Sequence, residues 1–380
     1  MTKQGYYKQF RCEAGPGRTA VKAGVLRLIL SASLGFLILG RSCLASEASA
    51  EIDIYSKLVE LKPLPKVHYS WGIYHKLLED PNSRQLYQLA RITHSLCVAG
   101  EWIDKQHIET VVYICARVNK TNPAIPSSIG VNYSPWHRKF GKDLPPTDRG
   151  ATYKAELDYF AERLNLIKKW VRLSNQKYGT DVRISALILD SERFYVRPGD
   201  EKWNDGIREA LDAIHLEAQS ILPDTWIEWY GRGITRPDGE TWMQTGLWTG
   251  REIKSPLSCS LYMIPEEEAM RQTFQKTCAL ADTYGIKEVI PHVALGSGYR
   301  RGVIKRINWD YNWDYDVIYS YRLGKDLNQT AKDSLYSRAS CVVFYPAPFY
   351  EKTPHWGEHF IAYVRGATGV EKLDDIGYKH

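Results

Sequence analysis

Two carboxylates separated by one serine stand at the end of a short apolar run, in the segment 186–194 with the sequence ALILDSERF. The run is typical of a buried strand, in which residues i and i+2 project to the same side, roughly 6.6 Å apart along the backbone. Asp190 and Glu192 therefore share one direction. Two carboxyl groups this close cannot both ionise freely, so one stays protonated beside a charged neighbour near neutral pH. General acid catalysis requires this arrangement.

The same two acids also have a structural interpretation. Either carboxylate could cap the helix that follows the strand, because a side-chain oxygen at that position accepts a backbone N–H. Either could instead form an ion pair with an arginine nearby in the sequence, at Arg183, Arg193 or Arg197. We favour the catalytic interpretation for Glu192 and keep the structural one open.

Eight short β-rich runs, separated by amphipathic runs, would position these acids. The predicted strands are 67–74, 95–100, 110–119, 183–190, 225–230, 258–263, 288–294 and 340–345. Several are apolar on both faces, as expected of parallel strands that helices cover. Eight strands in about 300 residues, without a glycine-rich phosphate loop, favour an α/β fold of the (β/α)8 TIM-barrel type over an open doubly wound sheet. We expect one barrel domain over residues 51–380, after an N-terminal signal segment.

The helices between these strands are predicted from apolar residues that recur every three or four positions. The clearest stripes are Leu157, Phe160, Leu164, Ile167 and Val171; Ile207, Leu211, Ile214, Ala218 and Ile221; and Met270, Phe274, Cys278 and Ala281. Gly285 is expected to end the third of these helices. The segment 120–150 is rich in Pro, Gly, Ser and Asn and follows the third predicted strand, so in a barrel it would lie at the carboxyl-terminal face.

The first 50 residues differ from the rest of the chain. A basic head precedes the apolar run 28–40, and Ala48-Ser-Ala50 follows it, which are the parts of a secretory signal peptide. We expect this segment to be removed on export, leaving a secreted or periplasmic protein without stable membrane association. It holds seven of the 50 Lys and Arg and two of the 44 Asp and Glu, which leaves 43 basic and 42 acidic residues. A chain this balanced argues against nucleic acid as a partner.

In a barrel, polar residues at the carboxyl ends of the strands converge on one crater. Glu228 and Tyr262, on the predicted fifth and sixth strands, join the two acids as catalytic candidates. Ten of the twelve tryptophans fall in predicted loops or near strand ends. Indole rings cover the apolar faces of sugars while polar neighbours bind the hydroxyls, so this crater favours a carbohydrate substrate, although such rings can also pack loops onto a barrel. The candidate substrate-binding residues are Trp71, Asn132, Trp136, Trp229, Tyr230, Arg232, His292, Tyr345 and Trp356.

Three short motifs carry a resemblance to a known group of enzymes. The segment 189–192, Leu-Asp-Ser-Glu, resembles the Asp-x-Glu that closes strand four in barrel glycosidases of the chitinase and hyaluronidase type. The segments 260–265 (SLYMIP) and 289–292 (VIPH) resemble the Ser-Ile-Tyr-Leu-Pro and Val-Tyr-Pro-Tyr runs of hyaluronidases, in the same order. The resemblance implies that Glu192 is the general acid. It also implies that Asp190 orients the N-acetyl group of the substrate, which attacks the anomeric carbon.

The chain departs from these families in ways that bear on mechanism. Ser185 and Ile188 stand where chitinases have two more aspartates, and the disulfides of the animal hyaluronidases are not evident. The commonest retaining barrel glycosidases carry a nucleophilic Glu at the end of strand seven, but here the only acid of that strand, Glu288, stands at its beginning. Two mechanisms stay open: either the substrate supplies the nucleophile, or Glu228 serves as second carboxylate with Glu192.

Two other functions also stay open. A metal-dependent hydrolase on the same fold usually needs clustered histidine and carboxylate ligands, whereas the pair His355 and His359 has no third partner in the sequence. A non-catalytic sugar-binding barrel would keep the aromatic residues and lose the acid, so the presence of Glu192 counts against it. No motif points to a nucleotide or another cofactor, and we expect none.

Overall fold

The structure is a computed structural model. It describes residues 64, 67–70, 75–121, 126–135, 150–190, 199–230, 255–261, 267–283, 285–293, 295, 313–327, 337–344 and 356–369. The predicted signal segment, residues 1–50, lies outside this set. Within the described part of the chain, no helix is long and apolar enough to cross a membrane.

Eight parallel strands close into a barrel in the order of the chain. The strands are β1 (Val67–Ser70), β2 (Ser95–Ala99), β3 (Ser128–Tyr133), β4 (Ile184–Asp190), β5 (Trp226–Tyr230), β6 (Leu257–Ser260), β7 (Val289–Val293) and β8 (Cys341–Phe344). Strand β1 pairs in parallel with both β2 and β8, which closes the ring. The predicted (β/α)8 barrel is thereby confirmed.

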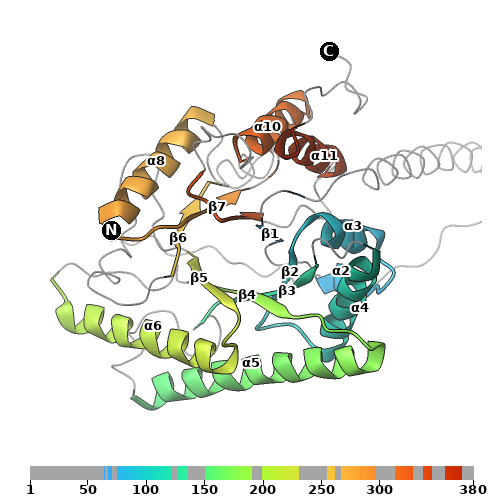
Figure 1. The fold of residues 1–380 in the computed structure, drawn as a ribbon. Coiled ribbons are helices and arrows are strands. Elements are labelled where there is room, and N and C mark those ends of the chain that lie inside the picture. The colour runs from blue at the N-terminus through green and yellow to red at the C-terminus, as the bar shows by residue number, and fades with distance from the viewer. Residues whose placement is uncertain are drawn as a thin grey trace, which may run out of the picture. The chain divides into compact units, whose positions relative to one another are not determined.

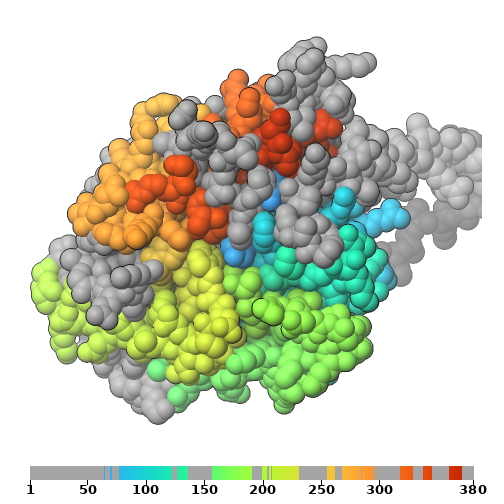
Figure 2. All heavy atoms as spheres, in the orientation of Figure 1, coloured from blue at the N-terminus to red at the C-terminus, as the bar shows by residue number. Residues whose placement is uncertain are grey.

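Helices lie around the outside of the strands (Figure 1). They are α2 (His75–Leu78), α3 (Arg84–Ile92), α4 (Lys105–Thr121), α5 (Gly150–Tyr178), α6 (Glu201–Ile221), α8 (Glu267–Thr283), α10 (Trp313–Asp326) and α11 (Trp356–Ala367). In Figure 2 the colours follow one another around the molecule, from the blue-green α3 and α4 through the green α5 and yellow-green α6 to the orange α8. These helices therefore follow one another around the barrel in the order of the chain, as expected for βα repeats.

The predicted helices α5, α6 and α8 are present, and most described residues of their apolar stripes are buried. In α5, for example, Phe160, Leu164 and Ile167 are fully buried. After α8 the backbone of Gly285 adopts a φ of 65°, and the N–H of Ile286 donates to the carbonyl of Ala281 at 2.8 Å. This left-handed turn satisfies a carbonyl at the end of the helix and directs the chain into β7.

Side chains alternate along each strand between the barrel interior and the helix layer. On β4, Leu187 and Leu189 belong to the large core that includes the helices, whereas Ala186 and Ile188 belong to a smaller cluster made only of strand residues. That smaller cluster fills the barrel. Asp190 continues the inward series, two residues beyond Ile188, because successive strand residues point to opposite faces.

The third predicted strand is wrong. Residues 110–119 lie in helix α4, where Ile108, Val111, Val112 and Cys115 are buried at the i, i+3, i+4, i+7 spacing of a helix face. The true third strand, β3, lies inside the segment 120–150, which we had expected to form a loop. The number of strands is unchanged, because one wrong strand replaces one missed strand, and β4 to β8 keep their predicted order.

The last two helices, α10 and α11, approach each other at two glycines. A Cβ atom on Gly324 would lie 2.1 Å from the carbonyl oxygen of Tyr363, and one on Gly366 would lie 2.1 Å from that of Tyr321. Real side chains do not approach backbone atoms this closely. The close packing of α10 on α11 therefore depends on the absence of a side chain at both positions.

Candidate functional site

Three neighbouring strands bring polar residues together where they end. Glu101 follows β2, Ser134 follows β3, and Asp190 is the last residue of β4. The chain keeps its pairing beyond β2, because the N–H of Gly100 donates to the carbonyl of Asn132 at 2.7 Å. These ends lie at the carboxyl-terminal face of the barrel, where this fold carries its active sites.

Ser134 connects the two acids. Its backbone N–H donates to Oε1 of Glu101, and its hydroxyl donates to Oδ2 of Asp190 at 3.0 Å. One residue therefore holds two carboxyl groups that lie far apart in the sequence. Asp190 itself is half-buried, so part of its surface is open at the mouth of the barrel.

Glu101 has the electrostatic properties of a group that retains a proton. Burial is the largest influence and raises the pKa of its carboxyl. The backbone N–H and the side chain of Ser134 lower the pKa, while the negative charge of Asp190 raises it. Two carboxyls held close together resist carrying two charges. The arrangement therefore favours the protonated form of Glu101 more than the surroundings of an isolated carboxyl would.

A second polar group lies deeper, within the barrel. Glu228 of β5 and His292 of β7 are both 0% exposed, and Oε1 of Glu228 lies 2.7 Å from Nε2 of His292. The other oxygen of Glu228, Oε2, has no hydrogen-bond partner among the described residues. The carboxylate of Glu228 therefore fixes the orientation of the imidazole from one side of the ring.

Tyr230 covers this pair on the side of the barrel mouth. Its ring packs against His292, with the ring centres 4.7 Å apart and the planes inclined by 45°. The hydroxyl of Ser260, on β6, donates to the Tyr230 hydroxyl at 3.4 Å. Asp190 and Tyr230 are direct neighbours in the pairing of β4 with β5. The polar side chains thus form an arc from β2 to β7 around the carboxyl-terminal half of the barrel.

Apolar and aromatic groups fill the interior below the arc. Tyr69 of β1 stacks on Trp226 of β5 with ring centres 5.2 Å apart and planes only 7° from parallel. Burial strongly raises the pKa of Tyr69, and nearby Cys341, Cys97 and Glu228 raise it further. The phenol therefore stays neutral, and this end of the interior contains no additional charge from Tyr69.

The structure gathers several of the predicted site residues and places one elsewhere. Asp190, Glu228, Tyr230 and His292 belong to the arc or to the pair beneath it, and Asn132 lies on the inward side of β3. Trp229 does not join them. It is fully buried in the helix layer, where its indole N–H donates to Nδ1 of His215 on α6 at 3.2 Å. Because Trp229 stands between two inward residues of β5, it must point outward.

The remaining predicted residues or their side chains are not among those that the structure describes. Glu192, Tyr262, Trp71, Trp136, Arg232 and Tyr345 lie outside the described residues. Trp356 begins α11, and its side chain also lies outside the description. Within the part that the structure describes, no group of three or more His, Cys, Asp or Glu side chains could hold a metal ion. His359, half of the histidine pair considered above, is a buried residue of α11.

Sequence reasoning missed Glu101 and Ser134. Glu101 comes two residues after the end of β2, and Ser134 comes one residue after the end of β3. The first had a usable signal, since an acid closely following a predicted strand at 95–100 stands at the functional face of a barrel. Ser134 had none, because the strand before it was not recognised.

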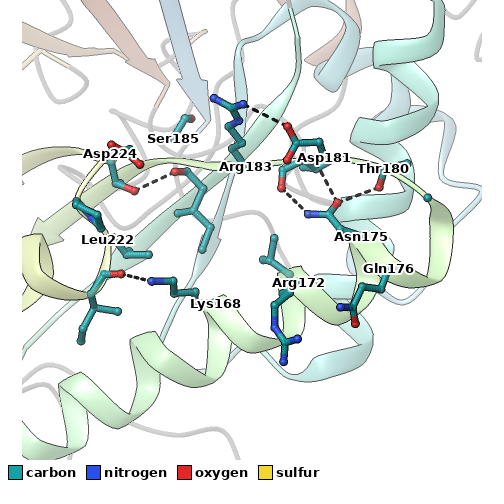
Figure 3. Close-up of a pocket in the computed structure, with 17 residues that line it drawn as sticks. Lys168, Arg172, Asn175, Gln176, Thr180, Asp181, Arg183, Ser185, Leu222 and Asp224 are labelled. Carbon is teal, nitrogen blue, oxygen red and sulfur yellow. Dashed lines mark hydrogen bonds and ion pairs between the residues drawn. The ribbon is translucent and has the colours of Figure 1, made fainter.

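An open cavity of about 790 Å³ lies at the other end of the barrel. It is lined by the end of α5, the start of β4 and the turn between α6 and β5. The ammonium of Lys168 donates to the carbonyl of Ile221 at 2.7 Å, and Arg183 pairs with Asp181 at 3.2 Å. Figure 3 shows Lys168, Asp181 and Arg183 at this cavity. The first contact joins α5 to the end of α6 near the amino ends of the strands, where residues of this fold serve stability. The cavity is therefore separate from the arc that contains Asp190.

No protein-family model matches the sequence, and no curated protein matches it. Among solved structures, the chain is similar to D-psicose 3-epimerase from Clostridium cellulolyticum H10 bound to D-tagatose, with a TM-score of 0.40 and 10% identity over 82% of this chain and 94% of that one. It is also similar to a glucosidase from Croceicoccus marinus, with a TM-score of 0.41 and 12% identity over 75% of this chain and 60% of that one. For an endo-1,4-beta-D-mannanase from Thermotoga petrophila RKU-1, the TM-score is 0.39 and the identity 12%, over 74% of this chain and 88% of that one. These distant neighbours are carbohydrate-active enzymes, and at such low identity the likeness concerns the fold alone.

Proposed function

We propose that the protein is a glycoside hydrolase that cleaves a poly- or oligosaccharide at the carboxyl-terminal face of the barrel. The observation that carries the proposal is the placement of Asp190. It ends β4 on the inward side, is half-buried, accepts a hydrogen bond from Ser134 at 3.0 Å, and has a second carboxyl, Glu101, beyond that serine. Glu192, two residues further along the chain, is proposed as the general acid from its position in the sequence and from the Asp-x-Glu resemblance.

In the proposed reaction the substrate supplies the nucleophile. Glu192 gives its proton to the glycosidic oxygen while the C–O bond breaks, and the acetamido oxygen of the substrate bonds to the anomeric carbon. Water then attacks that carbon, its proton passes to Glu192, and the acetamido group is released. Asp190 orients the acetamido group and balances the positive charge that develops on it. Its hydrogen bond from Ser134 fixes one of its oxygens for this role.

The position of Glu228 supports this mechanism over one with Glu228 as second carboxylate. Glu228 is fully buried, and its Oε1 is engaged by His292. A carboxylate in that position acts on its neighbour rather than touching a sugar. We therefore assign Glu228 the role of positioning His292, whose ring packs against Tyr230.

The rate of nitrophenol release from a panel of nitrophenyl glycosides, with and without a 2-acetamido group, tests the function directly. We expect cleavage to be confined to sugars that carry the acetamido group and to survive a chelator. Asp190→Asn should reduce the rate roughly a hundredfold or more. The matched control is Glu288→Gln. Glu288 is an exposed acid just before β7 that accepts a hydrogen bond from the hydroxyl of Ser340, and the rate of this variant should equal that of the wild type.

Each other result selects a different function. Glycan binding without turnover would indicate a sugar-binding barrel. Activity that a chelator abolishes and added zinc restores would indicate a metal-dependent hydrolase. Cleavage of sugars without the acetamido group would contradict the substrate-assisted mechanism.

We also propose export of the protein, on the basis of the basic and apolar composition of residues 1–50. Expression of the full chain in a secreting host and sequencing of the mature amino terminus test this. We expect the mature chain to begin close to residue 51, and retention of an uncleaved chain inside the cell would contradict the proposal.

A further inference from the structure

We propose that Glu101 is a third acidic group of this site, coupled to Asp190 through Ser134: the charge of Asp190 favours the protonated form of Glu101, and Glu101 holds the serine that hydrogen-bonds to Asp190. Glu101 is thereby a positioning residue for Asp190. Only the catalytic consequence rests on the glycosidase function proposed above. The coupling between the two carboxyls depends only on Glu101, Ser134 and Asp190 and not on the reaction that the protein catalyses.

The connection uses both donors of a single serine. The backbone N–H of Ser134 is directed to Glu101, and its hydroxyl is directed to Asp190 at 3.0 Å. Because the two donors belong to one residue, a movement of either carboxyl displaces the donor that the other one uses. The three residues come from the ends of β2, β3 and β4, which are adjacent in the barrel. The distance between the acids is therefore set by the pairing of the strands.

The loop that carries Glu101 is held on both sides. The Nε–H of Arg163, on α5, donates to the carbonyl of Gly100 at 2.8 Å, and a second N–H of the same guanidinium donates to the carbonyl of Ile103. A Cβ on Gly100 would lie 2.9 Å from Cγ1 of Val131, so the loop packs directly against β3. These contacts fix the backbone on both sides of Glu101 against α5 and β3.

Among the described residues, few groups near Glu101 could replace Asp190 as its electrostatic partner. In this part of the chain, the titratable and charged groups that act on Glu101 or on Tyr133 of β3 are Glu156, Tyr159, Arg163 and Asp190, together with Tyr133 itself. Burial strongly raises the pKa of Tyr133, which keeps its phenol neutral. The guanidinium of Arg163 is directed to two backbone carbonyls. Asp190 is the carboxyl that raises the pKa of Glu101 after burial has done so.

This coupling gives the site a defined charge. With Glu101 neutral and Asp190 ionised, the pair carries one negative charge, which suits an aspartate that must orient and stabilise a cationic intermediate. A positive charge that approaches the site favours the ionised form of Asp190, and Glu101 does not have to ionise as well. A site with two equal and fully charged carboxylates would instead bind protons or cations of its own.

The first experiment needs no substrate. In protein labelled with ¹³C at the glutamate side-chain carboxyls, the Glu101 signal is assigned as the one that Glu101→Gln removes, and its titration midpoint is compared between wild type and Asp190→Asn. We expect the midpoint in Asp190→Asn to fall by on the order of half a pH unit or more, because a neighbouring negative charge is gone. Glu109, whose partners are Lys177 and Tyr178 on α5, is the internal control, and its midpoint should not move. An unchanged Glu101 midpoint in a folded Asp190→Asn protein would overturn the proposal.

The second experiment asks whether the coupling reaches catalysis. Glu101→Gln keeps an oxygen that can accept the N–H of Ser134 but removes the titratable group. With the nitrophenyl glycoside that the wild type cleaves, we expect Glu101→Gln to leave the acidic limb of the kcat/KM profile in place, because Glu101 is already neutral where Asp190 ionises, and to remove the change in rate that ionisation of Glu101 causes at higher pH, while KM changes less than about twofold. Ser134→Ala should move the acidic limb to higher pH because Asp190 loses a donor. A pH profile identical to that of the wild type in both variants would overturn the catalytic role of Glu101. If the wild type cleaves no glycoside while the NMR shift is present, the glycosidase function fails and the coupling stands.

Discussion

The buried pair of Glu228 and His292 gives a strong test of how the barrel interior is built. Both side chains are 0% exposed, and their contact is 2.7 Å long. Removal of one member leaves the other enclosed without its partner, so Glu228→Leu and His292→Leu should each lower the free energy of unfolding by about 3–5 kcal/mol. The double variant removes both polar groups from the interior. It should cost no more than either single change, because apolar replacement of a buried pair is often neutral.

Urea unfolding of the two single variants and the double variant supplies the three free energies. Ile188→Val is the matched control, because Ile188 is the neighbour of Glu228 in the pairing of β4 with β5 and also fills the interior. It removes one methylene without leaving a polar group unpaired and should cost about 0.5–1.5 kcal/mol. Additive losses in the double variant, or a loss in Glu228→Leu no larger than that of the control, would refute the reasoning.

Two further predictions concern the last helices. Gly366→Ala should lower the free energy of unfolding by about 1–3 kcal/mol, because the new Cβ would lie 2.1 Å from the carbonyl oxygen of Tyr321, and urea unfolding that shows no loss would contradict the close contact of α10 and α11. Burial lowers the pKa of His359 to about 4 from its ordinary 6.5, so the unfolded chain takes up a proton that the folded protein resists, and stability falls as the pH drops through this interval. His359→Gln has no imidazole to protonate, so its stability does not carry this pH dependence. Between pH 7 and pH 4, the free energy of unfolding of the wild type should therefore fall by about 3 kcal/mol more than that of the variant. Urea midpoints of the two proteins that differ by the same amount at both pH values would contradict this prediction.

The barrel could be predicted because its strands and helices differ in the spacing of their apolar residues. Strands that are apolar on both faces and helices with one apolar stripe leave few alternatives to a parallel α/β fold. The third strand was missed for two reasons. Val111 and Val112 favour strands by composition, although their spacing with Ile108 is that of a helix. The true strand contains Gly130, where a Cβ would lie 2.2 Å from Sγ of Cys97. The barrel interior therefore requires a glycine at this position, and the residues next to it in the sequence do not reveal that requirement.

The candidate site was predictable in part. Asp190 follows from its place at the end of a buried strand, and the inward direction of Glu228 follows from the same alternation. The same alternation predicts that Trp229 points outward. We predicted it as a substrate-binding residue because tryptophans often contact sugars, and did not apply the alternation. The bridge of Ser134 could not be predicted, since its partners Glu101 and Asp190 lie 33 and 56 residues away and meet only when the strands pair.

The most direct test of the proposed glycosidase compares two leaving groups in Glu192→Gln. The variant and the wild type are assayed for kcat/KM on two glycosides of the same 2-acetamido sugar, one with an alcohol and one with dinitrophenol as the leaving group. An alcohol needs a proton in order to leave, whereas dinitrophenolate leaves as a stable anion. We predict a loss of roughly a hundredfold or more with the alcohol and of less than about tenfold with dinitrophenol. Equal losses on both glycosides, or full activity on both, would contradict the assignment of Glu192 as the general acid.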